Sequence, residues 1–225
     1  MHSEIYASPD FAMVDVTLQP GESLVAESGA MVGMTTNIQL KTAARGGVLA
    51  GLKRKLLGGE SFFINTFTAV NTPGMVHIAP AVPGDVMRQN LNNETLMIQS
   101  SCFLASAPTV NLDTKWGGAK GFFSGTGMFL LKASGVGDLY ISSYGAVHPV
   151  QVQGKYIVDT GHIVAFQDSL TYSIRKVGGL KSLFFSGEGL VCEFSGNGML
   201  WLQTRNASSF ASWIHPFRPV KAKSN

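Results

Sequence analysis

The chain has 225 residues, of which 45% are hydrophobic and only 14% are charged, and its net charge is +3. That much apolar material can bury a sizeable core, so the composition excludes a disordered chain. The weak positive charge argues against a nucleic-acid-binding protein, and no apolar run reaches the ~20 residues of a membrane-spanning helix.

The first residues, MHSEIYASPDFAMVDV, contain neither the basic region nor the long apolar region of a secretory signal. The two cysteines, Cys102 and Cys192, lie inside apolar runs and form no disulfide framework. Buried thiols of this kind are typical of a reducing compartment. We therefore expect a cytoplasmic protein.

The first predicted β unit spans residues 14–88. Its block ESLVAESGAMVGMTTNIQL, which begins at Glu22, has short apolar runs with the alternation of strands. A glycine pair, the step LLGGESFFINTF and the closing run MVHIAP follow. One segment between them has helical spacing instead, which predicts a short amphipathic helix inserted near 47–57.

The same order of segments recurs in residues 91–150 and 151–205. The blocks ETLMIQSSCFLASAPTVNL and YIVDTGHIVAFQDSLTY align with the first block, so that Leu24, Leu96 and Tyr156 occupy matching positions. A unit of about five strands cannot close a core by itself. We therefore predict one all-β domain, residues 1–225, of three repeats related by a pseudo-threefold axis.

Ser-Gly-x-Gly tetrads mark the second half of the later repeats. Two occur in FFSGTGMFLLKASGVG and two in FFSGEGLVCEFSGNG. A phosphate-binding loop needs a helix after its glycines, whereas these tetrads lead into strand patterns. We interpret the glycines as turns or bulges with positive φ.

The tail over 206–225 begins with NASSFASWIHPF. Asn206 is a good N-cap, Phe210, Trp213 and Ile214 share one helical face, and Pro216 ends the pattern. We expect a short helix that packs on the sheet.

The stretch GGLKSLFFSGEGLVCEFSGNGMLWLQTRNASSFASWI over 178–214, with PGESLVAESGAMVGM and LLGGESFF, resembles the AIM24 family along essentially the whole chain. The resemblance implies a β fold like that of the tryptophan RNA-binding attenuator protein, duplicated within one chain. It brings no catalytic residues. The yeast member is linked to mitochondrial inner-membrane organisation, whereas we expect no transit-like extension here and a protein of the compact bacterial type.

Basic residues in the predicted inserted helix form a candidate docking surface. Lys53, Arg54 and Lys55 lie beside an apolar stripe, which suits a partner protein or an anionic membrane. The alternative is an ordinary solvated helix face.

Cys102 and His162 occupy the same repeat position, so both could line a pocket on the pseudo-threefold axis. The alternatives are that the two side chains only fill the axis, or that His162 pairs with Asp159 on a turn. The histidines lack metal-ligand spacing, and no nucleophile motif is present. We therefore predict no cofactor and no metal.

These patterns favour a non-enzymatic interaction or scaffold protein with unidentified protein partners. Open sheet edges favour a homo-oligomer, and peripheral membrane contact is a further expectation. An enzyme or small-ligand binder at the axis is the alternative. RNA binding, by analogy with the attenuator protein, is the second alternative, although the charge does not support a nucleic-acid partner.

Overall fold

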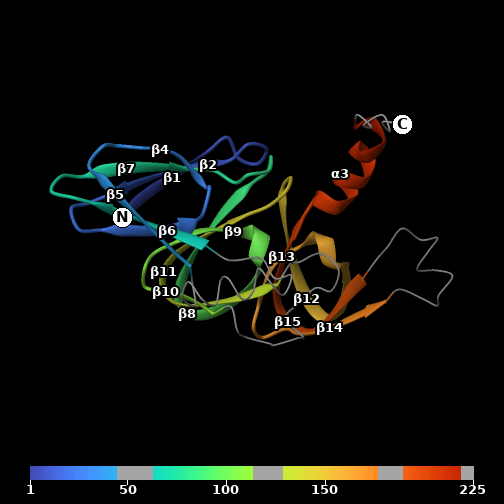
Figure 1. Cartoon of the computed structure of the whole chain (residues 1–225). Helices are drawn as coiled ribbons and strands as arrows, with labels where there is room; N and C mark the ends of the chain where they lie inside the picture. Colours follow the sequence, from blue (N-terminus) through green and yellow to red (C-terminus); the bar gives the residue numbers. More distant parts are fainter. Residues whose placement is uncertain (45–62, 114–128, 177–189, 219–225) are drawn as a thin grey trace.

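The computed structural model describes residues 1–44, 63–113, 129–176 and 190–218 of the chain (Figure 1). The predicted helix near 47–57, with its three basic residues, lies outside these ranges. The described residues are predominantly strands in large antiparallel sheets, which confirms the predicted all-β class. In the described part of the chain, no helix is long and apolar enough to cross a membrane.

The smaller sheet has four antiparallel strands in the order β1-β2-β7-β4. Apolar and polar residues alternate along its central strand β2, so that Val14, Val16 and Leu18 face the core. The four strands are β1 (His2–Tyr6), β2 (Met13–Leu18), β4 (Met31–Met34) and β7 (Gly74–Ile78).

The larger sheet has eleven strands. Its path runs β12-β15-β13-β8-β11-β9-β3-β6-β5, while β10 pairs with β11 and β14 pairs with β15. These strands are β3 (Ser23–Glu27), β5 (Ile38–Ala44), β6 (Phe63–Ala69), β8 (Val86–Gln99), β9 (Phe103–Ser106), β10 (Val110–Asp113), β11 (Leu130–Ser142), β12 (Val147–Asp159), β13 (Ile163–Gln167), β14 (Thr171–Lys176) and β15 (Leu190–Gln203).

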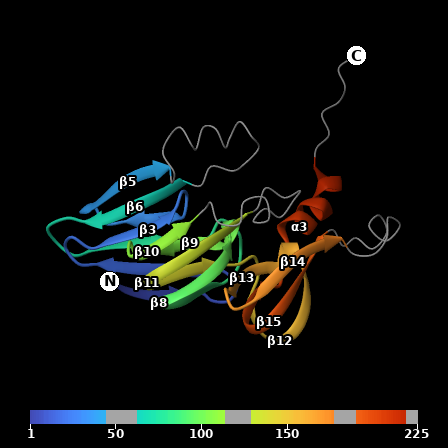
Figure 2. The same cartoon turned by 90° about the horizontal axis from the view of Figure 1, so that it is seen from below.

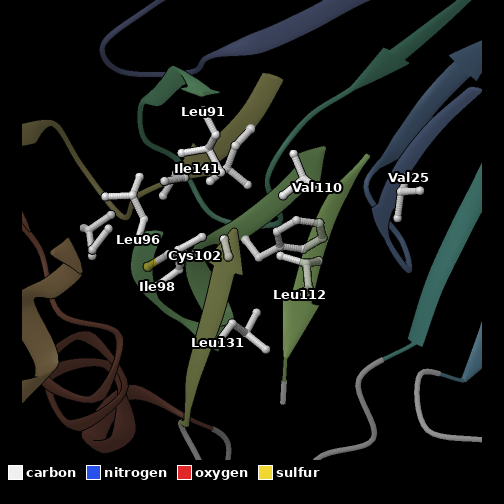
Figure 3. Close-up of a cluster of buried hydrophobic side chains, with 14 of the residues drawn as sticks. Val25, Leu91, Leu96, Ile98, Cys102, Val110, Leu112, Leu131 and Ile141 are labelled. Carbon is white, nitrogen blue, oxygen red and sulfur yellow. The ribbon is translucent and has the colours of Figure 1, made fainter. Parts of the chain in front are cut away.

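Three clusters of buried side chains form the core, and each combines residues from more than one predicted repeat. The middle cluster gathers around β8, β10 and β11 (Figure 3). The described strands form two sheets rather than three equivalent ones. The pseudo-threefold arrangement therefore stays a prediction.

The first region lacks the long strands that the later regions contain. The long strands β8, β11, β12 and β15 run without interruption, whereas Pro20 and Gly21 separate β2 from β3. Asn71, with a φ of 64°, and Pro73 likewise separate β6 from β7. Proline removes a ladder donor and positive φ turns the chain, so each break sends the two halves into different sheets.

The tetrads that begin at Ser134 and Ser195 have the predicted backbone. Gly135, Gly137 and Gly196 adopt φ values of 120°, 133° and 132°. The register of β11 against β8 shifts at Gly135, as it does at a β-bulge. The prediction of bulges or positive φ is confirmed at these two tetrads, and the other two lie outside the described residues.

The predicted tail helix is present as α3 (Ala207–Ile214), followed by the 3₁₀ turn η4 (His215–Phe217). The Asn206 side chain accepts hydrogen bonds from the backbone amides of Ser208 and Ser209, which confirms the N-cap. The expectation that α3 packs on the sheet is wrong. None of its residues is buried, because the chain leaves the sheet after β15 and projects from the body (Figures 1 and 2).

Candidate functional site

A cavity of about 320 Å³ lies where all three predicted repeats meet. The first repeat contributes Glu27 and Val82, the second Cys102, and the third Gly161. Hydroxyl groups dominate its polar lining, through Ser28, Ser100, Ser101, Ser142, Ser143 and Ser208.

Turns at the ends of strands place these serines, and part of their hydrogen bonding holds the fold. Ser100 belongs to the 3₁₀ turn η1 (Ser100–Cys102), and its hydroxyl accepts a bond from the Phe129 amide at 3.3 Å. The Ser142 hydroxyl donates to the Cys102 carbonyl at 3.3 Å, and the Ser143 hydroxyl to the Gly145 carbonyl at 2.5 Å. The polar part of the cavity wall is therefore uncharged at these serines and tied to the backbone, while residues such as Val82 and Phe129 make the rest apolar.

Cys102 lies in this wall with its side chain buried among aliphatic residues such as Leu96 and Ile98 (Figure 3). Burial raises the pKa of the Cys102 thiol to about 12. Burial also raises the pKa of the Cys192 thiol to about 12. Both cysteines are free and buried, which confirms that part of the prediction. A thiol with so high a pKa stays protonated near neutral pH and is a poor nucleophile.

His162 lies against a different cavity, which Tyr156 and Asp159 also line. It ends the 3₁₀ turn η3 (Thr160–His162), and its Nδ1 is 2.7 Å from the Gln203 carbonyl oxygen. The Asp159 carboxylate accepts a bond from the Gly161 amide at 2.7 Å, so it caps the same turn. Cys102 and His162 therefore border separate cavities.

Gln203 lines both of these cavities. Its side-chain amide donates to the Gly161 carbonyl at 2.8 Å, and its Oε1 accepts from the Tyr144 amide at 2.9 Å. The glutamine thus joins the end of β15 to turns of two other segments. Sequence reasoning did not single it out, because a glutamine at a strand end carries no distinctive pattern.

Ionisable side chains on the sheets form cross-strand pairs. His77 Nδ1 lies 2.5 Å from Asp15 Oδ1, and Arg88 Nε lies 2.9 Å from Asp138 Oδ1. The hydrogen bond to Asp138 raises the pKa of Arg88. Within the ranges that the structure describes, no group of three or more His, Cys, Asp or Glu side chains could hold a metal ion.

The tail carries exposed apolar side chains, and three of them, Phe210, Trp213 and Ile214, were expected to pack on the sheet. Phe210, Trp213, Ile214 and Phe217, here called the α3 aromatic surface, are all exposed. The rings of Phe210 and Trp213 lie 5.9 Å apart, and those of Trp213 and Phe217 lie 5.7 Å apart. Phe210 also meets the ring of Tyr144 edge-on, at 6.1 Å. This contact ties the start of α3 to the body.

Comparison with known proteins identifies the family of this chain. The sequence model described as "Mitochondrial biogenesis AIM24" matches residues 3–205. The chain belongs to the AIM24 family.

Two relatives of this AIM24 protein come from Streptococcus pyogenes. The uncharacterised protein M6_Spy0233 of serotype M6 is 28% identical over 231 residues, covering 99% of this chain and 93% of that protein. The crystal structure of protein SPYM3_0169 superposes with a TM-score of 0.81 at 27% identity, covering 96% of this chain and 99% of the other. The resemblance inferred from the sequence is thus confirmed.

Proposed function

We propose that this protein is a non-enzymatic scaffold that docks on the surface of an anionic membrane through α3. The observation that carries the proposal is the exposure of the α3 aromatic surface, where Trp213 is 64% exposed. An eight-residue helix is marginal without packing. Trp and Phe side chains on such a helix bind at the level of the lipid headgroups.

The charge of the tail favours a lipid surface over an apolar protein groove. From Arg205 to the end of the chain the sequence contains four basic residues, Arg205, Arg218, Lys221 and Lys223, and no Asp or Glu. Each basic residue close to an anionic leaflet contributes about 1 kcal/mol to binding. The exposed aromatic side chains and the positive charge of the tail therefore both favour an anionic membrane surface.

The chemistry of the described titratable side chains supports a non-enzymatic role. The thiols of Cys102 and Cys192 are kept protonated by burial, and carboxylates such as Asp138 and Glu193 pair with basic side chains of neighbouring strands. Groups engaged in this way stabilise sheets rather than act on a substrate.

Vesicle flotation tests the proposal. We expect the protein to float with vesicles of phosphatidylglycerol and phosphatidylcholine, less so at high salt, and not with phosphatidylcholine alone. Trp213→Ala/Phe217→Ala should abolish flotation, while Phe11→Ala, which removes an exposed ring elsewhere, should not.

Flotation of the double variant as strong as that of the unmodified protein would refute docking through α3. Failure of the unmodified protein to float would refute the membrane proposal itself and leave a protein partner for this helix. The variant Lys53→Glu/Arg54→Glu/Lys55→Glu tests the docking surface predicted from sequence in the same assay.

Small-ligand binding is the second candidate function, since residues of all three predicted repeats line the 320 Å³ cavity. Its wall combines apolar surface with serine hydroxyl groups, which suits a small, partly apolar ligand that carries hydroxyl or carbonyl groups. Native mass spectrometry of the protein from its own cells should then show a bound small molecule that Ser101→Trp removes. If the unmodified protein has only the mass of the polypeptide, with no bound molecule, the result would count against this function.

A further inference from the structure

At two junctions in the large sheet, a strand of one predicted repeat pairs with a strand of the next repeat. The two junctions have the same register. Strand β9 pairs with β3, where Val25 lies opposite Ser106. Strand β13 pairs with β8, where Met97 lies opposite Phe166. The shifts that align the sequence repeats bring Val25 onto Met97 and Ser106 onto Phe166. The two junctions are therefore alike residue by residue.

The strands β4 and β12 occupy the matching positions for a third junction, but they are not paired with each other. The same shifts bring Met34 of β4 onto Ser106 and Phe166, and Ile157 of β12 onto Val25 and Met97. Among the described strands, β4 pairs only with β7 and β12 pairs only with β15. Each therefore presents a free edge at the position where its counterparts form a junction.

Side-chain burial follows the same division. Met97 and Phe166 are each 1% exposed, whereas Ile157 is 53% exposed and Met34 is 38% exposed. Strand β9 is buried throughout and β13 almost throughout, while three of the four residues of β4 are exposed. Apolar side chains that face water along an unpaired strand edge mark a surface that is covered in assembly.

The two free edges lie apart in the folded chain. In Figure 1 β4 lies among the blue N-terminal strands at one end of the molecule and β12 at the other. In Figure 2 the blue strands again lie away from β12. The chain therefore does not join these edges to each other, and a second copy carries the matching edge for each of them.

We infer that β4 of one copy pairs antiparallel with β12 of a second copy, with Met34 opposite Ile157. The pairing repeats the register of the two internal junctions and buries Met34 against Ile157. This inference is independent of membrane docking, which uses the tail.

The contact is head-to-tail, so every added copy presents a new free edge and the assembly grows until it closes as a ring or continues as a filament. The internal junctions contain only two and three paired residues. A ladder of that length between separate chains gives concentration-dependent association, because no linker holds the two edges together.

Disulfide cross-linking without lipid tests the register. Opposed residues of an antiparallel pair have Cβ atoms ~4.5–5.5 Å apart, close to what a disulfide needs. Mixing a Met34→Cys protein with an Ile157→Cys protein should give a reducible species of twice the chain mass. Val136→Cys, on an exposed part of β11, replaces Met34→Cys in the control mixture. The native thiols are buried and should not interfere.

Equal dimer yield in the test and control mixtures would overturn the inference. So would an intrachain disulfide at monomer mass in the double variant Met34→Cys/Ile157→Cys, because it would show that one chain joins its own two edges. The double variant should instead give a ladder of covalent oligomers. Since no vesicles are present, the result does not depend on the function of α3.

Discussion

Strands β9 and β13 lie inside the large sheet, whereas β4, which matches them in sequence, lies at the edge of the small one. All three are short and apolar, with the sequences FLAS, IVAFQ and MVGM. Strand β9 has neighbours on both sides in β11 and β3, as β13 has in β15 and β8. Burial of these strands is thus decided by neighbours from other segments and not by the local sequence.

The interrupted strands of the first region explain why β4 differs. The breaks after β2 and after β6 move β2 and β7 into the small sheet, and β4 follows its partner β7 there. The strands β8 and β11 continue unbroken, so β9 stays in the large sheet beside β11. Proline and glycine at two breaks therefore determine which strand keeps a free edge.

The largest expected effect contrasts Phe166 with Met34, its counterpart on the free edge. Phe166→Ala should lower the free energy of unfolding by about 3–5 kcal/mol, because it leaves a cavity in the core. Met34→Ala should lower it by less than about 1 kcal/mol in dilute solution, where the edge is solvated. Urea denaturation at low protein concentration measures both, and equal losses would abolish the distinction between interior and edge.

A smaller effect separates two glycines with positive φ. Gly135→Ala should lower the free energy of unfolding by about 2–4 kcal/mol, because its Cβ would lie 2.5 Å from the Thr109 carbonyl oxygen and its φ is 120°. Gly154, on the edge strand β12, has a φ of 89° and open space around it, so Gly154→Ala should cost about 1 kcal/mol. Thermal unfolding of the two variants checks the order, and a reversed order would contradict this placement of β12.

The smallest effect concerns pH and the two buried thiols. Burial raises the pKa of Cys102 from 9.0 to about 12 in the folded chain. Because the folded value is the higher one, the stabilisation is complete below pH 9 and is lost as the pH rises toward 12. Above pH 9 each thiol should remove about 1.4 kcal/mol per pH unit.

Urea denaturation from pH 7 to pH 9.5 measures that loss, which should reach about 1.4 kcal/mol for the two thiols together, and Cys102→Ala/Cys192→Ala is the matched control. The control variant should lose less stability above pH 9 than the unmodified protein. If the free energy of unfolding fell equally with pH in the two proteins, the burial of the thiols would be contradicted. Rapid alkylation of the folded protein at pH 8 would contradict it independently.

Much of the fold could be predicted because its local signals are strong. Alternation at Val14, Val16 and Leu18 marks a strand, the glycine at 135 marks a bulge, and Asn206 marks the start of α3. These features depend on residues within a few positions of each other. Hydrogen bonds and sterics over that range are encoded directly in the sequence.

The environment of the candidate site could not be predicted in the same way. Matching repeat positions place both Cys102 and His162 at the end of a 3₁₀ turn, and both turns are present. The direction of each side chain depends on what the other segments supply. The middle core surrounds Cys102, and the Gln203 carbonyl holds His162 at another cavity. For the same reason the aromatic pattern of α3 predicted a helix but not whether the body covers it.

The most direct test of the pairing between β4 of one copy and β12 of another is sedimentation velocity of the unmodified protein, without lipid, from micromolar to millimolar concentration. We predict a mass that rises above the 24.0 kDa of one chain, and an Ile157→Lys variant that stays at that mass. A mass of 24.0 kDa for the unmodified protein over the whole range would contradict the pairing of β4 with β12.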